Sequence, residues 1–173
     1  MQWNHGNPHA LRLIYEKYKH TLVTLATALL YDKTAAEDIV HNLFAHLLEK
    51  RQQIRIATNL KSYLSCAVAN GARNINRRQN RSPGQSLDAI DCDPQSSCPQ
   101  PALFIEQKEE NSILAEALGR LPFEQREVIL LRHYSGLRFK TIAALQETSV
   151  NTVQGRYRYG MDKLRSLLNG ELQ

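Results

Sequence analysis

The stretch TIAALQETSVNTVQGRYRY, residues 141–159, predicts a short helix, a tight turn and a second helix that carries arginines. Ser149 can act as the N-cap of the second helix, which would then begin at Val150. The side chains that would lock the two helices together are apolar and helically spaced: Ile142, Leu145, Val150 and Val153. A helix-turn-helix of this kind inserts its second helix into the major groove of DNA.

The second predicted helix offers side chains that can bond with base edges and phosphates. We expect DNA contacts from its cap, its first turn and its arginines, that is, from Ser149, Asn151, Thr152, Gln154, Arg156 and Arg158. Arg156 is expected on a phosphate, and one of Tyr157 and Tyr159 is expected to pack in the core. An ordinary amphipathic helix pair with solvated arginines explains this segment equally well, so the rest of the chain has to decide.

The composition and charge of the chain favour two nucleic-acid-facing units. Its 173 residues suffice for one domain of ordinary size or two small ones, and a hydrophobic content of 42% is compatible with a packed core. Residues 1–78 hold 11 Lys and Arg against 5 Asp and Glu, residues 79–111 hold 2 against 6, and residues 112–173 hold 9 against 6. Two basic blocks separated by an acidic one are typical of two such domains on a linker.

The chain shows neither a membrane span nor a disulfide framework. The longest apolar stretch, residues 22–31, is too short to cross a bilayer and contains threonines. The N-terminus carries no secretory signal, so we expect a cytoplasmic protein. The cysteines Cys66, Cys92 and Cys98 include no CxxC pair, which argues against disulfides and against zinc. Cys66 is expected to be a small core residue.

Residues typical of catalysis or of cofactor binding are not apparent in the sequence. The nearest histidines, His41 and His46, are five positions apart and do not share a helix face, which disfavours metal ligation. Neither a Gly-rich phosphate loop nor a Ser/His/Asp set is present. We therefore expect no enzymatic activity, no metal and no cofactor.

Helical periodicity dominates the first 79 residues. Pro8 is well placed to begin a helix, and apolar residues then recur every three or four positions: Leu11, Ile14, Tyr15, Tyr18, Leu22, Leu25 and Leu29. Thr34 and Glu37 match a capping box, Thr-x-x-Glu, that would open a second helix. After a polar loop at 49–58, a third helix is expected at 59–78, ending in the basic cluster Arg73, Arg77, Arg78 and Arg81.

The second half of the chain begins with a change of composition. Residues 79–102 contain four prolines among Ser, Gln and Asp, which predicts a flexible linker. Pro122 is well placed to start a helix at 123–133, followed by a turn at Gly136, and the apolar stripe before it consists of Ile113, Leu114, Ala117, Leu118 and Leu121. The sequence thus predicts an all-α fold of two small helical domains, residues 1–79 and 111–173, joined by a flexible linker at 80–110, with a helix-turn-helix in the second domain.

Two sets of motifs lie on either side of the predicted linker. Before it stand AAEDIVHNLFAHLLEK at 35–50 and SYLSCAVANGARNINRRQ at 62–79, and after it LPFEQREVILLRHYSGLRFKTIA at 121–143 and SVNTVQGRYRYGMDKLRSLL at 149–168. The first set resembles region 2, and the second region 4, of bacterial RNA polymerase sigma factors of the extracytoplasmic-function (ECF) group, the small kind with only these two regions. Both sets occur in the order of the family, which makes coincidence improbable.

Three positions depart from the family pattern. His41 stands where the family usually has Gln, and Asn74 stands where Asp is frequent. In the turn, Gln146–Glu147–Thr148 replaces the usual Leu-Gly and apolar residue. Because a left-handed residue is easy for Gly and costs others about 1–2 kcal/mol, Glu147 is expected to make this turn strained or reshaped.

The resemblance implies that the first domain docks on the clamp helices of the largest polymerase subunit and reads the −10 promoter element. The residues carried over for docking are Asp38, His41, Asn42 and Phe44, and those for the −10 element are Lys61, Asn70, Arg73, Asn74, Arg77 and Arg78. In the loop, Gln52, Gln53 and Asn59 are candidates for capturing an unstacked base. A solvated helix end that satisfies the helix dipole explains one or two of the basic charges, but not the cluster.

The resemblance implies that the second domain reads the −35 element as duplex DNA and contacts the polymerase flap with the apolar face of residues 128–134. The expected partners are core RNA polymerase and promoter DNA, and an anti-sigma factor is a further candidate. The function expected is that of a transcription initiation factor that directs the polymerase to promoters.

Two alternatives remain open at this point. A stand-alone helix-turn-helix regulator explains residues 141–159 but gives residues 35–50 and 62–79 no role. A helical adaptor whose basic patches bind protein or RNA is the other, and it would not support promoter-specific transcription.

Overall fold

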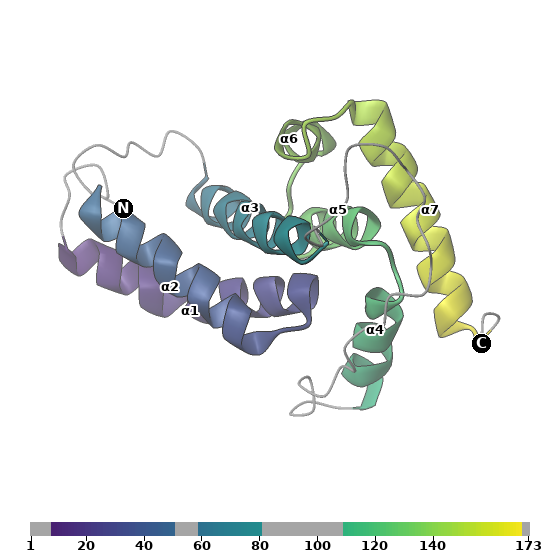
Figure 1. The fold of residues 1–173 in the computed structure, drawn as a ribbon, viewed down its shortest axis with the longest axis horizontal. Coiled ribbons are helices and arrows are strands. Elements are labelled where there is room, and N and C mark those ends of the chain that lie inside the picture. The colour runs from purple at the N-terminus through teal and green to yellow at the C-terminus, as the bar shows by residue number, and fades with distance from the viewer. Residues whose placement is uncertain (1–7, 51–58, 81–108, 171–173) are drawn as a thin grey trace.

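The computed structural model describes residues 8–50, 59–80 and 109–170, which form seven helices and no strand. In chain order these are α1 (Pro8–Leu30), α2 (Lys33–Glu49), α3 (Leu60–Gln79), α4 (Glu109–Gly119), α5 (Phe123–His133), α6 (Phe139–Leu145) and α7 (Val150–Leu168) (Figure 1). The predicted all-α class is confirmed, while the expected linker and loop fall mostly outside these ranges. Within the described ranges, no helix is long and apolar enough to cross a lipid bilayer.

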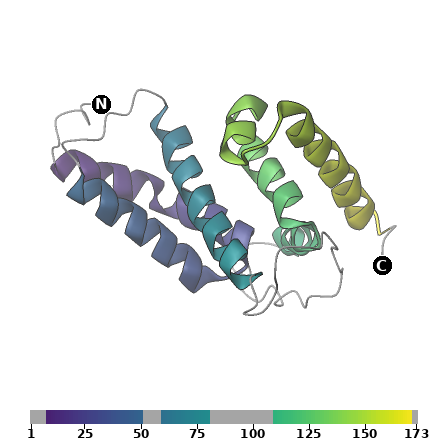
Figure 2. The same cartoon turned by 45° about the horizontal axis from the view of Figure 1, so that its top comes forward.

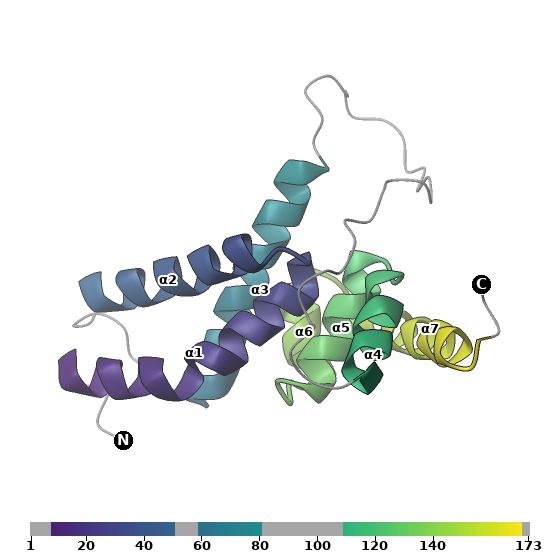
Figure 3. The same ribbon diagram turned by 90° about the horizontal axis from the view of Figure 1, so that it is seen from below.

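The first three helices pack into one body around an apolar core. α1 runs beside α2, and α3 crosses them (Figure 3). The predicted stripe of α1 is confirmed, since Leu22, Leu25 and Leu29 are fully buried. Tyr15 of α1 meets Phe44 of α2 edge to face, with ring centroids 4.9 Å apart. Burial of each large apolar side chain contributes about 1.5–3 kcal/mol, and this holds the three helices together.

The start of α2 differs from the prediction. Asp32 is the N-cap, because its Oδ1 accepts a hydrogen bond from the Ala35 N–H at 3.0 Å. The helix therefore begins at Lys33, and Thr34 and Glu37 are exposed residues inside it. The predicted capping box is wrong because Asp32, an equally good cap two residues earlier, already satisfies the first turn.

The helices α5, α6 and α7 form the predicted helix-turn-helix. Ser149 is the N-cap of α7, since the Thr152 N–H donates to Ser149 Oγ at 3.0 Å, and that prediction is confirmed. Ile142 and Val153 are fully buried. Val150 is 37% exposed and does not lock the helices as expected, because it occupies the first position of α7, where solvent reaches its side chain.

The helix α4 packs on α7 but leaves part of its predicted stripe exposed. Ala117 and Leu118 are buried in a small cluster with Leu164 of α7. Ile113 and Leu114 are 57% and 41% exposed. The predicted stripe is therefore only partly confirmed, because α7 covers the C-terminal half of α4 and not its start.

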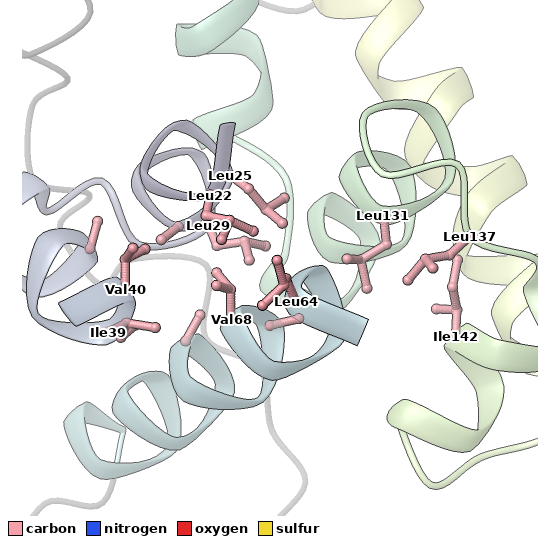
Figure 4. Close-up of a cluster of buried hydrophobic side chains, with 14 of the residues drawn as sticks. Leu22, Leu25, Leu29, Ile39, Val40, Leu64, Val68, Leu131, Leu137 and Ile142 are labelled. Carbon is pink, nitrogen blue, oxygen red and sulfur yellow. The ribbon is translucent and has the colours of Figure 1, made fainter. Parts of the chain in front are cut away.

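The two helical bodies pack on each other. One apolar cluster continues from Leu22 and Leu29 of α1 through Leu64 of α3 to Leu131 of α5 and Ile142 of α6 (Figure 4). Figure 2 shows α3 running alongside α5 and α6. The sequence did not predict this contact, because a flexible linker leaves the relative position of two domains undetermined.

Candidate nucleic-acid interface

The helix α7 presents most of its predicted DNA contacts to solvent. The exposed ones beyond the cap are Asn151, Thr152, Gln154 and Arg158. Val153, between them, faces the core and has no exposed surface. Ser149 is exposed, but its hydroxyl is already engaged as the cap and lies 2.8 Å from the Thr152 hydroxyl. The start of α7 thus offers amide and guanidinium groups, the types that bond with base edges.

Arg156 differs from the other predicted contacts because it is half-buried. Its Nη1 donates to Gln146 Oε1 at 2.7 Å, so a phosphate contact would require it to leave this partner. Tyr157 packs against Phe139, with ring centroids 5.3 Å apart, whereas Tyr159 is 61% exposed. The expectation that one of the two tyrosines packs in the core is therefore confirmed.

The turn before α7 contains the left-handed residue that the sequence predicts. Glu147 has a φ of +52°, a conformation that glycine adopts most easily. The Thr148 N–H donates to the Ala143 carbonyl at 3.0 Å, and the Glu147 N–H donates to the Ala144 carbonyl at 3.4 Å. These two bonds form a Schellman motif, so the turn keeps a usual geometry and the Glu147 backbone carries the strain.

The predicted −10 residues on α3 fall into two groups. The exposed ones are Asn70, Asn74, Arg77 and Arg78. Lys61 and Arg73 are half-buried because both reach the C-terminal body, and Lys61 Nζ donates to the Tyr134 carbonyl at 3.1 Å. Part of the predicted DNA surface is therefore covered by the second helical body.

Of the residues that directly precede α3, the structure describes Asn59 but not 51–58. Asn59 is the N-cap of α3, since its Oδ1 accepts from the Lys61 N–H at 2.9 Å. Its side chain thus has a structural role in addition to the base contact expected of it. Gln52 and Gln53 lie outside the described residues.

The predicted docking residues on α2 do not all share one face. Asp38, His41 and Asn42 are exposed, while Phe44 is 7% exposed and packs against Tyr15. The structure therefore brings the three polar residues together at the surface and excludes Phe44 from it, because its ring belongs to the core.

Arg73 and Glu127 form a buried ion pair between the two bodies. Arg73 Nη2 donates to Glu127 Oε1 at 2.5 Å, and the Glu127 side chain has no exposed surface. Gln146 Nε2 donates to the other carboxylate oxygen at 2.7 Å, and Arg73 also donates to the Leu145 carbonyl. Gln146 in turn binds Arg156. Two predicted DNA contacts, Arg73 of α3 and Arg156 of α7, are thus connected through the side chains of Glu127 and Gln146.

The environment of the Glu127 carboxyl favours its neutral form. Burial raises the pKa of Glu127 above its usual range, and the Arg73 charge and the hydrogen bonds from Gln146 and Arg73 lower it by less. Burial also raises the pKa of the Cys66 thiol, which packs against the core as a free, half-buried cysteine. Because Arg73 of the first body influences the pKa of Glu127 in the second, the ionisation of Glu127 is coupled to the contact between the two bodies.

Both halves of the chain match known protein families. Residues 14–82 match sigma-70 region 2, and residues 112–164 match sigma-70 region 4. Over 158 residues the chain is 25% identical to the ECF RNA polymerase sigma-E factor of Escherichia coli, covering 87% of this chain and 82% of that protein. The chain is an ECF-type RNA polymerase sigma factor. Sigma factors direct RNA polymerase to promoters through these regions and are not themselves enzymes, as the sequence led us to expect.

This sigma factor is also similar to a Xanthomonas campestris pv. campestris protein named "Probable RNA polymerase sigma factor RfaY". The two are 27% identical over an alignment of 181 positions, which covers 98% of this chain but only 44% of the length of that relative. Among solved structures, the sigma factor RpoE of Bartonella quintana, in complex with the anti-sigma factor NepR, matches with a TM-score of 0.65 at 21% identity, over 90% of this chain and 96% of that one. This likeness shows a shared fold.

Sequence reasoning missed Glu127 in region 4 of this sigma factor. Its spacing carries a signal, because Glu127 lies four residues after Phe123 and four before Leu131, and both are buried. A carboxylate on a buried helix stripe requires a partner from another element. The partner is Arg73, some fifty residues away in region 2, which the spacing alone does not identify.

Proposed function

We propose that this sigma factor binds core RNA polymerase through α2 and directs it to promoters by reading the −10 element with α3 and the −35 element with α7. The observation that carries the proposal is the presence of two basic helices, one in each matched sigma region, with exposed amide and basic side chains. A stand-alone regulator has no use for the first of these helices.

At the −10 element, the proposed contacts come from the basic end of α3. The exposed residues Arg77 and Arg78 bind phosphates next to the melted strand, where each charge releases counterions. Asn70 and Asn74 lie on the same helix and bond with bases or sugars. Lys61 and Arg73 join the contact once they leave their partners in region 4.

At the −35 element, the proposed readers are the exposed residues Asn151, Thr152, Gln154 and Arg158 of α7. Amides and guanidinium groups discriminate base pairs in the major groove by paired hydrogen bonds. Ser149 supports this contact as the N-cap that orders the first turn. Arg156 binds a phosphate after it leaves Gln146.

The proposed docking face on the clamp helices of the polymerase consists of Asp38, His41 and Asn42. Phe44 supports this face from within the core and does not touch the polymerase. In region 4, Val128 and Leu131 have no exposed surface, so a flap contact falls on Tyr134, which is 38% exposed. A docking face built from polar side chains suits a partner that binds and dissociates.

Residues 80–110 are proposed as the linker that lets regions 2 and 4 reach promoter elements some distance apart. We infer action in the cytoplasm, where the polymerase is, without membrane insertion. An anti-sigma factor is a further proposed partner, supported by the complex of Bartonella quintana RpoE with NepR.

In-vitro transcription tests the proposal. Core RNA polymerase, a genomic template pool and the purified protein are combined, and transcription start sites are mapped. We expect starts that depend on the protein and share two elements at a constant spacing. Absence of such starts, together with tight, sequence-specific DNA binding by the protein alone, would instead identify a stand-alone helix-turn-helix regulator.

A pull-down of core polymerase tests the docking face. Asp38→Lys reverses a charge in the middle of the exposed face and is expected to reduce core binding at least about tenfold. Glu49→Lys makes the same type of change at the exposed end of α2 and serves as the control. An equal loss of core binding in both variants would show that the docking site lies elsewhere on the chain.

A further inference from the structure

The buried face of α7 has a glycine at its centre. The buried residues of this helix are Val153, Gly160 and Leu164. A Cβ at Gly160 would lie 3.0 Å from Ile129 Cδ1 of α5, so the two helices approach each other closely at this point. A glycine offers no side chain that interlocks with the neighbouring helix. The contact therefore does little to prevent α7 from rotating about its own axis.

Tyr157 lies on the same face of α7, between Val153 and Gly160, and contacts two other helices. Its ring meets Phe139 of α6 edge to face, with centroids 5.3 Å apart, and stacks on His133 of α5 at 5.6 Å. Its hydroxyl is hydrogen-bonded to His133 Nε2 at 2.7 Å. One side chain of α7 is thus attached to the last residue of α5 by both a ring contact and a hydrogen bond.

The end of α5 that carries His133 is itself held in place. Arg132 Nη1 donates to the Leu137 carbonyl at 3.1 Å, and the Arg132 guanidinium carbon lies 5.0 Å from the centroid of the Phe139 ring. A hydrogen bond and a cation–π contact therefore fix the last turn of α5 against the start of α6. His133 offers Tyr157 a partner in a defined position.

The residue before Tyr157 attaches α7 in a second direction. Arg156 donates to Gln146 in the turn after α6, and consecutive helix residues point about 100° apart. Both bonds lie just after Gln154, the last of the base readers proposed for the first turns of α7. When Arg156 leaves Gln146 for a phosphate, as proposed above, the bond between Tyr157 and His133 stays in place.

We propose that His133 is a positioning residue for the −35 element, which through Tyr157 fixes the rotation of α7 and thereby determines which exposed side chains of that helix face the base edges. Hydrogen bonds to base edges require aligned donors and acceptors, so a small rotation of the helix weakens them. The inference rests on the proposed reading of the −35 element by α7 and adds a residue that acts without contacting DNA.

A positioning role affects discrimination between DNA sequences more than stability. His133 is exposed, and a hydrogen bond at the surface contributes little to folding. A mismatched base pair usually lowers affinity at least about fivefold, because a correctly placed side chain loses its partner. An α7 that is free to rotate loses bonds at the matched site and has fewer to lose at a mismatched one. The ratio between the two sites therefore falls.

Discrimination is measured with the holoenzyme. Core RNA polymerase and the full chain transcribe a template pool in which the upstream element, located from the mapped start sites, is randomised and each template carries a transcribed barcode. His133→Phe keeps a stacked ring without the hydrogen bond, and Tyr157→Phe removes the hydroxyl from the other side. Each is expected to lower the transcript ratio of the preferred element to singly substituted elements about threefold. His20→Phe and Tyr18→Phe on α1 are the matched controls and are expected to leave this ratio unchanged.

A double-mutant cycle shows whether His133 acts through Tyr157. Because both single changes remove the same bond, the double variant is expected to lose no more discrimination than either single variant. His133→Gln supplies an amide that can bond to the Tyr157 hydroxyl, and it is expected to retain more discrimination than His133→Phe. In the presence of Tyr157→Phe, this advantage of glutamine is expected to disappear.

The outcomes separate the inference from the proposed function. An unchanged ratio in both single variants overturns the inference, and so does an equal fall in transcript yield on every template, which assigns the pair a purely structural role. A loss of discrimination in His133→Phe that Tyr157→Phe does not share identifies a direct DNA contact of His133 and overturns the positioning role. Start sites of the unmodified holoenzyme without a shared upstream element overturn the proposed function, and the inference with it.

Discussion

At the scale of single residues, Glu147 holds a left-handed φ of +52° with its side chain exposed. Glycine removes the steric penalty without deleting a buried contact, so Glu147→Gly is expected to raise the free energy of unfolding by about 1 kcal/mol and to leave promoter choice unchanged. Denaturant unfolding followed by circular dichroism measures the change. Glu37→Gly, at an exposed position inside α2, is the control and is expected to lose about 1 kcal/mol. A less stable Glu147 variant would mean that the side chain holds the turn.

Two glycines of α7 are expected to respond oppositely to alanine. A Cβ at Gly155 meets no atom within 4 Å, so Gly155→Ala is expected to stabilise the protein by about 0.5–1 kcal/mol. At Gly160 the Cβ would lie 3.0 Å from Ile129 Cδ1 and 3.2 Å from Gln125 Cβ on α5. Gly160→Ala is therefore expected to give no gain or to destabilise by about 1 kcal/mol. Equal gains in thermal unfolding would show that α5 and α7 are less closely packed than described.

At the scale of helices, the start of α7 depends on one hydrogen bond, from the Thr152 N–H to Ser149 Oγ. Ser149→Ala is expected to lower the free energy of unfolding by about 1 kcal/mol and to weaken binding to a duplex that carries the −35 element, while Ser149→Gly is expected to cost only a few tenths. Thermal unfolding and duplex titration of both variants measure these effects. Similar losses of duplex affinity in the two variants would assign that effect to a contact of the serine side chain with the DNA rather than to the cap.

Helix ends and buried faces differ in how far the sequence predicts them. The starts of α1, α5 and α7 agree with prediction because a proline or a capping serine acts locally. The start of α2 was wrong because Asp32 and Thr34 can both cap, and the sequence gives no rule for choosing between them. The exposure of Ile113 on α4 was missed because it depends on how far α7 extends over that helix.

At the scale of the whole molecule, the contact between regions 2 and 4 is expected to depend on pH through Glu127. In the closed form, with the two bodies packed together, burial raises the pKa of Glu127. An open form, with the bodies apart, would lose the part of this burial that α3 provides. The closed form therefore binds this proton more tightly than the open one. The contribution to closure is fully present below the usual glutamate pKa, about 4.3, and is lost as the pH rises through the raised value.

Resonance energy transfer between dyes at the exposed positions Ala45 of α2 and Lys163 of α7 is thus expected to increase as the pH falls through the raised pKa of Glu127. Glu127→Gln cannot titrate and is expected to abolish this pH response, which separates Glu127 from the histidines. The polar and titratable groups around Glu127 are Arg73 and Cys66 of α3, Glu124 of α5, Gln146 after α6 and, beyond Gln146, Arg156 of α7. A decrease of transfer on acidification in the unmodified chain would contradict the assigned direction.

The sequence by itself determined the helical class, the two basic halves, the helix-turn-helix and most of the residues proposed to contact DNA. These follow from periodicity, capping and charge, which act between residues close in the chain. Only the tertiary structure decided that Phe44 belongs to the core, that Glu127 pairs with Arg73, and that the Tyr31 ring lies against α4. The physical reason is that these contacts join residues far apart in the chain, Phe44 with Tyr15 inside the first body and the other two pairs across the linker, and no local spacing determines which surfaces bury each other.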